Sequence, residues 1–185
     1  TLTRGLPEVT DIVAAPPYNE KELLKIAASG ENPSIHPLAQ AIARRARKED
    51  LEIEEVKDYF EESGHGGSCL YRGKKLLLGN KRHMQKHGID TAPVEPFFQQ
   101  LASAGKTTMF VSLDGSIAGL IALADVLKES SHEAVKRLQS LGVKTFMITG
   151  DNKRVAQVVG QELGIDEINA EVLPQDKINI IKRYQ

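Results

Sequence analysis

A polar turn that follows a short apolar strand is the clearest candidate for chemistry in this sequence. Residues 143–148 (VKTFMI) are rich in β-branched and apolar side chains, and the run TGDN at 149–152 follows directly. A helical pattern then begins, so Asp151 or Asn152 can cap that helix. The hydroxyl of Thr149 and the backbone N–H groups of the turn would converge at one point, which suits a phosphoryl group. The alternative is an ordinary strand-to-helix turn capped by aspartate.

Three other side chains could contact a phosphorylated or nucleotide ligand. Lys177 opens a predicted helix over 175–184 and can reach a phosphate as a point charge, or it is a solvated lysine. The stiff backbone of Pro37 holds His36 at a helix start, so its ring can stack on a purine, or it caps its own helix. Glu31 can accept a hydrogen bond from an exocyclic amine, or it is a solvated loop carboxylate.

Glycines in two places allow a ligand to approach the backbone closely. The run GHGG at 64–67 precedes a predicted strand, and Gly79 follows three leucines. A bulge or a turn explains the same glycines without a ligand. The run is not a P-loop, because no GK[ST] follows it, and no Ser or Cys nucleophile motif is present. The other histidines show no spacing typical of a metal site; they are His65, His83, His87 and His132.

Local patterns predict the elements that position these residues. Glu8–Ala14 alternates as a strand does, and the breaker-rich run Ser29–Ile35 is predicted to be a loop between two helices. Arg72-Gly73 and Asp114-Gly115 each separate two strand-like runs, which is typical of a hairpin turn. The second of these hairpins is predicted to end at Leu123.

The order of these elements predicts two domains. Hairpins dominate the first two-thirds of the chain, whereas helix and strand alternate after Asp125. We therefore expect an antiparallel α+β domain at residues 9–118, inserted into an α/β domain. Residues 1–8 would be a strap of that α/β domain, and residues 119–185 would be its partial remainder.

Composition excludes several classes of function. With 24 Lys and Arg against 25 Asp and Glu, the net charge of −1 offers no bulk attraction for nucleic acid or an anionic membrane. The single Cys69 cannot form an internal disulfide, which favours a reducing compartment. No apolar run is long enough for a membrane span. A chain that opens on Thr1 and stops within a predicted helix is expected to be an excised fragment.

Several separated pieces resemble motifs of one family, the heavy-metal-transporting P-type ATPases, and specifically their large cytoplasmic loop. TLT at 1–3 resembles the end of the family's DKTGTLT phosphorylation motif, and SIHP at 34–37 resembles its His-Pro motif. The other matches are to glycine motifs of the nucleotide-binding domain and to two phosphorylation-domain motifs; they are GHG at 64–66, GN at 79–80, TGDN at 149–152 and LPQDK at 173–177. The resemblance covers the whole chain in order.

For the nucleotide-binding domain, the resemblance implies that His36 and Glu31 hold the adenine of ATP. Gly64, Gly66 and Gly79 would line the nucleotide pocket. We then expect Gly66→Val to weaken nucleotide binding more than folding, because a side chain there would block approach to the backbone.

For the phosphorylation domain, the resemblance implies a haloacid-dehalogenase-like, Rossmann-type fold with ATP and Mg²⁺ as cofactors. Thr149, followed by Gly150 of the same motif, would hydrogen-bond the phosphoryl group. Lys177 would neutralise its charge, and Asp151 would help to close the site. The fold class is thus an incomplete α/β phosphorylation domain that carries an inserted antiparallel nucleotide-binding domain.

Two motifs of the family fall outside the sequence. The phosphorylated aspartate would lie four residues before Thr1, and the Mg²⁺-binding GDGxND segment would lie beyond Gln185. The parent is therefore expected to be a metal-exporting ATPase, whose actuator and transmembrane domains are partners, while this cytoplasmic part binds ATP and turns over little. It would bind neither the transported metal nor nucleic acid. Ile35 stands where copper pumps of the family often have glutamate, so the resemblance implies a zinc, cadmium or cobalt pump more than a copper pump.

Two other hypotheses explain part of the pattern. A soluble haloacid-dehalogenase-like phosphatase with a cap domain accounts for the TGDN run and Lys177, but not for His36-Pro37 or the glycines. A non-catalytic interaction module accounts only for the missing aspartate. Binding of ATP to the first domain would distinguish the pump from both.

Overall fold

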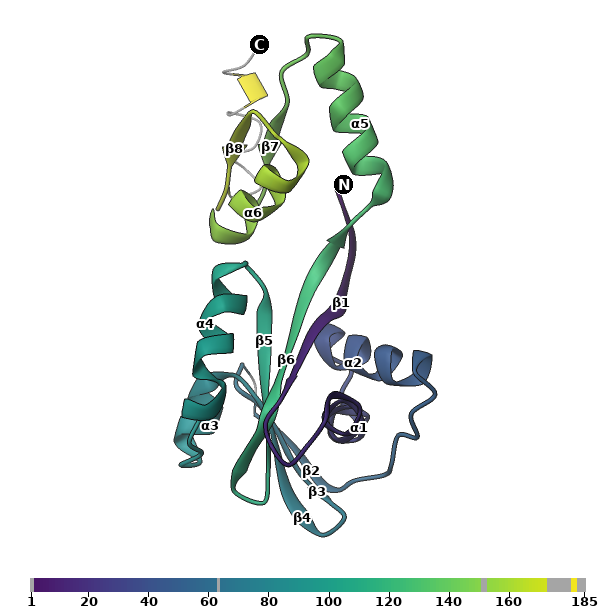
Figure 1. Ribbon diagram of the computed structural model, residues 1–185, viewed down its shortest axis with the longest axis vertical. Coiled ribbons are helices and arrows are strands. Elements are labelled where there is room, and N and C mark those ends of the chain that lie inside the picture. Colours follow the sequence, from purple (N-terminus) through teal and green to yellow (C-terminus); the bar gives the residue numbers. More distant parts are fainter. Residues whose placement is uncertain (1, 63, 151–152, 173–180, 183–185) are drawn as a thin grey trace. The chain divides into compact units, whose positions relative to one another are not determined.

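The computed structural model describes residues 2–62, 64–150, 153–172 and 181–182, which fall into two compact units (Figure 1). The antiparallel unit comprises residues 5–102 and 106–126. The C-terminal unit comprises residues 1–4, 103–105 and 127–185.

A six-stranded sheet in the order β1-β6-β5-β4-β3-β2 forms the centre of the antiparallel unit. The strands are β1 (Thr3–Ala14), β2 (Lys57–Glu62), β3 (Gly66–Tyr71), β4 (Lys74–Gly79), β5 (Thr107–Leu113) and β6 (Ser116–Leu127). Neighbours from β2 to β6 pair antiparallel. Both predicted hairpin turns are confirmed, since φ is 51° and 77° at Arg72-Gly73 and 55° and 81° at Asp114-Gly115. Two successive positive φ angles match the twist of antiparallel strands.

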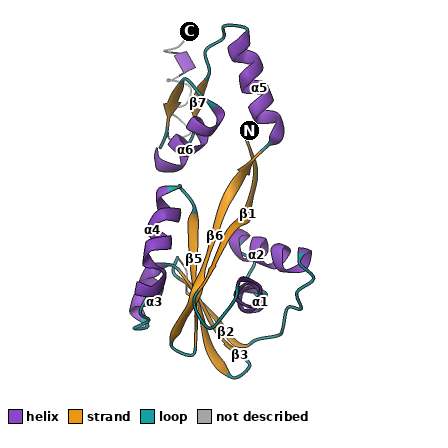
Figure 2. Ribbon diagram, viewed as in Figure 1, coloured by secondary structure: helices purple, strands orange, loops and turns teal. Residues whose placement is uncertain are grey.

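Helices cover both faces of this sheet (Figure 2). The pair α1 (Glu20–Glu31) and α2 (Pro37–Lys48) packs on one face, and α3 (Lys81–Lys86), a 3₁₀ turn η1 (Ala92–Val94) and α4 (Glu95–Ser103) pack on the other. Alternation along β4 supplies both cores. Leu76 and Leu78 belong to the cluster under α1 and α2, whereas Leu77 belongs to the cluster under α3 and α4.

Three predicted boundaries in the antiparallel unit were wrong. β1 begins at Thr3 instead of Glu8, and β6 continues to Leu127 instead of ending at Leu123. Strand pairing with a neighbour extends both beyond their alternating cores. Helix α1 runs on to Glu31 because Gly30 lets its last turn lie against β4. A Cβ at Gly30 would be only 2.5 Å from a Leu78 methyl group.

The C-terminal unit contains a strand-helix-strand motif. It consists of β7 (Phe146–Ile148), α6 (Lys153–Leu163) and β8 (Glu167–Asn169), preceded by α5 (Glu129–Ser140). β7 and β8 pair parallel, as the predicted alternation requires. β7 is shorter than the predicted strand over 143–148. The helix predicted over 175–184 lies largely outside the described residues. None of the described helices is both long and apolar enough to cross a membrane.

Candidate functional site

A cavity of about 200 Å³ in the antiparallel unit brings together all five residues predicted to hold a nucleotide. These five are Glu31, His36, Gly64, Gly66 and Gly79. The rest of the lining comes mainly from β2, β3 and β5 and the segments beside them; it consists of Ser34, Tyr59, Glu61, His65, Gly67, Asn80, Thr108 and Met109. The residues come from distant parts of the sequence, so the sheet and α1 together create the cavity.

Glu31 is the buried acid of this cavity. Glu31 is only 6% exposed, so it is not a solvated loop carboxylate. Burial raises the pKa of Glu31 to about 7, and the negative charge of Glu61 adds to the increase. No Lys or Arg in the described part of the chain pairs with it to offset this cost. Near neutral pH, Glu31 therefore exists in both forms, as a hydrogen-bond acceptor and as a donor.

His36 caps its own helix and still offers its ring to the cavity. Its Nδ1 accepts a hydrogen bond of 3.2 Å from the Leu38 N–H at the start of α2. Its own N–H donates to Ser34 Oγ at 3.2 Å. A neutral ring whose Nδ1 accepts must carry its proton on Nε2. The cap therefore fixes the tautomer of the exposed His36 ring, and the two interpretations of this residue are compatible.

Gly66 and Gly79 face each other across β3 and β4. Their φ angles of 149° and 157° belong to a region that side chains disfavour. A Cβ at Gly66 would overlap the carbonyl oxygen of Leu78, and one at Gly79 would overlap that of His65. The expectation that Gly66→Val mainly disturbs ligand binding is therefore wrong, because the two strands themselves need this glycine pair.

Gly64 differs from the other two glycines. It has a φ of 75°, and a Cβ there would meet no heavy atom within 4 Å. Its carbonyl accepts a hydrogen bond of 2.9 Å from the Asn80 side chain, and the Asn80 N–H donates to the His65 carbonyl at 2.9 Å. Asn80 thus joins the loop at 64–65 to the start of α3, leaving Gly64 exposed at the edge of the cavity.

Sequence reasoning missed two residues of the cavity as possible ligand contacts. Tyr59 lies on β2 and hydrogen-bonds through its side chain to Ser34, which is buried. An aromatic in a strand is usually a core residue, so nothing distinguished Tyr59 beforehand. Ser34 came from a run predicted to be a loop, yet it is buried. Its N–H donates to the Glu31 carbonyl at 2.9 Å, and its own carbonyl accepts from the Gln40 side chain at 2.8 Å.

Thr149 lies directly after β7, at the carboxyl edge of the parallel pair. Its N–H donates to the Asn169 carbonyl at 2.9 Å, and its own carbonyl accepts from the Val172 N–H at 3.0 Å. The exposed Gly150 follows it. The ends of β7 and β8 therefore meet where a parallel sheet presents its ligand site. The predicted partners Asp151 and Lys177 lie outside the described residues.

A family model described as haloacid dehalogenase-like hydrolase matches residues 1–185. The chain belongs to this family. The predicted fold class is therefore confirmed for this haloacid dehalogenase-like chain, which carries a six-stranded antiparallel sheet.

Curated relatives of this haloacid dehalogenase-like chain are P-type ATPases. It is 39% identical over 185 residues to a copper-exporting P-type ATPase of Bacillus subtilis. It is 37% identical over 185 residues to copper-transporting ATPase 2 of Rhizobium meliloti. Both alignments cover the whole chain, which spans only 23% and 22% of those two proteins.

Solved structures agree with these sequence relatives. A zinc-transporting PIB-type ATPase in its E2.Pi state matches with a TM-score of 0.92 and 35% identity, over 100% of this chain and 30% of that one. The catalytic domain of the CPx-ATPase CopB-B, described for its conformational changes upon nucleotide binding, matches with a TM-score of 0.66 and 26% identity, over 99% of this chain and 62% of that one.

The N-domain of a copper-transporting P-type ATPase matches with a TM-score of 0.53 and 26% identity, over 64% of this chain and 98% of that one. The resemblance to the cytoplasmic region of heavy-metal P-type ATPases is thereby confirmed over the full chain.

Proposed function

We propose that this chain is the ATP-binding and phosphorylation region of a transition-metal-exporting P-type ATPase. The single observation that carries the proposal is the cavity. It brings together the buried acid Glu31, the His36 ring that is held by its helix cap, and the exposed loop glycine Gly64. The parent would couple ATP hydrolysis to metal export through an aspartyl phosphate. This region would then be a cytoplasmic domain of an integral membrane protein, with actuator and transmembrane domains as partners.

The antiparallel unit would bind the nucleoside. An adenine presents an exocyclic amine that donates hydrogen bonds and a flat ring. Ionised Glu31 can accept from the amine, and the His36 ring can stack on the base with its Nε2–H still free to donate. Gly64, where a Cβ would meet no neighbour, lets a ligand approach the loop backbone. The nucleotide-binding domain would be this antiparallel unit, residues 5–102 and 106–126, because the bounds 9–118 expected from the sequence would divide strand β6.

The C-terminal unit would act on the phosphoryl group. Thr149 would donate its hydroxyl hydrogen bond to a phosphoryl oxygen beside Gly150, at the end of β7. Lys177 would supply a compensating positive charge, and Asp151 would help to close the site. These groups stabilise charge that develops in the transition state, so they contribute more to phosphoryl transfer than to ATP affinity.

Mg²⁺ is expected to arrive with the phosphates of ATP. Among the described residues, the one group of three candidate metal ligands is Glu62, His83 and His87, and its two imidazoles do not suit Mg²⁺. The described residues therefore do not fit a Mg²⁺ site of their own. We propose that the attacked aspartate lies before Thr1, so the chain by itself binds ATP and turns over little.

Titration of the isotope-labelled chain with ATP tests the nucleotide site. Amide shifts are expected at Glu31, His36 and Gly64, and His36→Gln should weaken binding by about 1–2 kcal/mol, the scale of one hydrogen bond with its stacking. The matched control is His132→Gln, which changes a half-exposed histidine of the C-terminal unit. Unchanged affinity in His36→Gln would remove His36 from the site. A chain that ignores ATP but hydrolyses small phosphate esters would be a phosphatase instead.

The role of the C-terminal unit is tested in the full-length protein, by acyl-phosphate formation from labelled ATP. Thr149→Ala and Lys177→Ala should each reduce phosphoenzyme formation or turnover severely, with ATP affinity within a few-fold of the wild type. A variant that loses ATP binding yet phosphorylates normally at saturating ATP would contradict this division of roles.

A further inference from the structure

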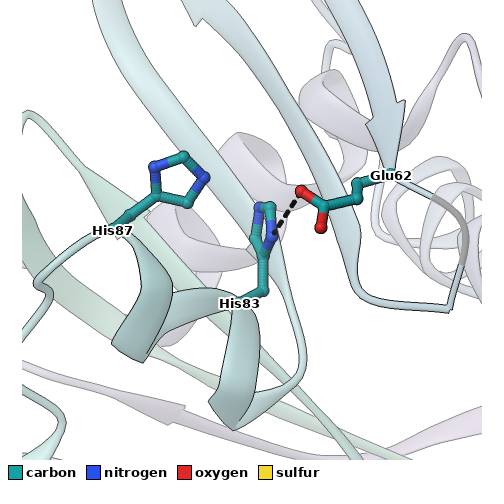
Figure 3. Close-up of side chains that lie close together, drawn as sticks. All are labelled: Glu62, His83 and His87. Carbon is teal, nitrogen blue, oxygen red and sulfur yellow. Dashed lines mark ion pairs between the residues drawn. The ribbon is translucent and has the colours of Figure 1, made fainter.

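A cluster of two histidines and a glutamate lies on the α3 side of the sheet, apart from the groups proposed to bind ATP. Glu62, His83 and His87 each offer a ligand atom, and these atoms all lie within 4.8 Å of one another. Figure 3 shows the Glu62 carboxylate and the His87 ring on either side of the His83 ring. Nδ1 of His83 is 3.9 Å from the Glu62 carboxylate, and the two ring centroids are 4.8 Å apart.

The local fold places these side chains together. Asn80 caps α3, and its side chain accepts from the His83 N–H at 3.0 Å. His87 follows one turn later, and its own N–H donates to the His83 carbonyl. A spacing of four residues puts both imidazoles on the same side of one helical turn. Glu62 ends β2 and reaches the pair from the sheet.

His83 is the observation that calls for a ligand. Its side chain is 2% exposed, yet neither ring nitrogen has a hydrogen-bond partner among the described residues. A buried polar side chain left without a partner destabilises the folded state, because it has lost its hydrogen bonds to water.

The geometry points to a divalent transition-metal site formed by Glu62, His83 and His87. Two imidazoles and one carboxylate are a ligand set that suits zinc, with a fourth position left for water. The same set disfavours Mg²⁺ and Ca²⁺, which prefer oxygen ligands. Tetrahedral zinc with bonds of about 2.0–2.1 Å separates its ligands by roughly 3.3 Å. Ligand atoms that lie up to 4.8 Å apart must therefore approach one another by up to about 1.5 Å.

Lys86 is the competitor for this site. Its ammonium pairs with both carboxylate oxygens of Glu62, at 2.8 and 2.9 Å. His65 faces the same carboxylate, at 3.7 Å. A divalent ion would replace the Lys86 charge at Glu62. Removing the Lys86 ammonium should therefore increase the affinity for the metal. If the three side chains had only a structural role, its removal would not create metal affinity.

Titration of the purified full chain with Zn²⁺, in competition with a chromophoric chelator, tests the site. The absorption of bound Co²⁺ then reports whether the coordination is tetrahedral. His87→Ala and Glu62→Gln should each weaken Zn²⁺ binding by about tenfold or more, since even outer-shell changes cost 10–100-fold. Lys86→Gln should strengthen binding. His132→Ala, which changes the one histidine of the C-terminal unit, should leave it unchanged.

His83→Gln should also weaken Zn²⁺ binding, but it changes a buried residue and its protein must first be shown to fold. His87 is exposed, so His87→Ala is the main test. Chemical shifts of the two imidazoles, followed during Zn²⁺ addition, provide a readout independent of stability. The inference is overturned if Zn²⁺ binding survives His87→Ala and Glu62→Gln unchanged, if Co²⁺ shows only octahedral absorption, or if the Zn²⁺-induced shifts appear at His132 instead.

Discussion

Glu31→Gln should abolish a large pH dependence in the stability of the antiparallel unit. Burial, with Glu61 beside it, raises the pKa of Glu31 from 4.5 to about 7. Because the folded state prefers the protonated acid, this contribution is complete below about pH 4.5 and is lost as the pH rises through about 7. At about 1.4 kcal/mol per pKa unit, the ionised acid costs the folded state about 3 kcal/mol above pH 7. Glutamine cannot ionise, so it avoids this cost.

Urea unfolding at pH 5 and pH 8 measures this effect, followed by methyl signals of Leu76 and Leu78 in the core under α1. Between these two pH values the wild type should lose about 2–3 kcal/mol relative to Glu31→Gln. The comparison uses the change in unfolding free energy between the two pH values in each protein. Any pH-independent cost of an amide at position 31 therefore cancels. Glu61→Gln is the control, and it should lower the pKa of Glu31 only in part. The reasoning is refuted if both proteins share one pH slope, or if the Glu31 carboxyl titrates near 4.5 by NMR.

Three further predictions concern other parts of the antiparallel unit. Gly66→Ala should lower the free energy of unfolding in urea by about 2–4 kcal/mol, whereas Gly64→Ala, at an open position, should cost about 1 kcal/mol; equal losses would contradict the overlap argument. If ATP needs ionised Glu31, its dissociation constant should fall about tenfold from pH 6 to pH 8 by calorimetry, and Glu31→Gln should remove this dependence. Hydrogen bonds first from Arg72 and then from Lys25 lower the pKa of Glu54 to about 2, so the stability that Glu54 contributes above pH 4.5 should be lost as the pH falls towards 2. The stability of Glu54→Gln should fall less than that of the wild type over the same pH range. An unchanged acid-unfolding curve would argue against a stabilising role for the hydrogen bonds of Glu54 with Arg72 and Lys25.

Local chemistry predicted the hairpins, but long-range packing decided the rest. The Arg72-Gly73 and Asp114-Gly115 turns depend on two residues each, so the sequence window contains the whole cause. The end of α1 does not. Ser29 and Gly30 are helix-breaking residues in isolation, and only β4, more than forty residues away, makes a glycine there favourable.

The candidate site divides in the same way. Residue types with distinctive chemistry, such as His36 beside a proline, were predictable. Their environment was not, because the burial of Glu31 and its raised pKa result from how α1 packs against the sheet. The metal cluster was missed for a related reason. His83 and His87 have a common helical spacing, but Glu62 joins them only through strand β2.

The two ends of the antiparallel unit lie beside each other, which has an evolutionary consequence. The Gly5 N–H donates to the Asp125 side chain at 3.0 Å, where the first strand enters the unit and the last one leaves it. On the other side of that junction, the Lys128 N–H donates to the Leu2 carbonyl at 3.0 Å. A segment whose entry and exit are adjacent can be gained, lost or exchanged as a cassette without opening the domain that receives it. Under the proposed function, recombination between relatives could therefore replace nucleotide preference and phosphoryl chemistry separately.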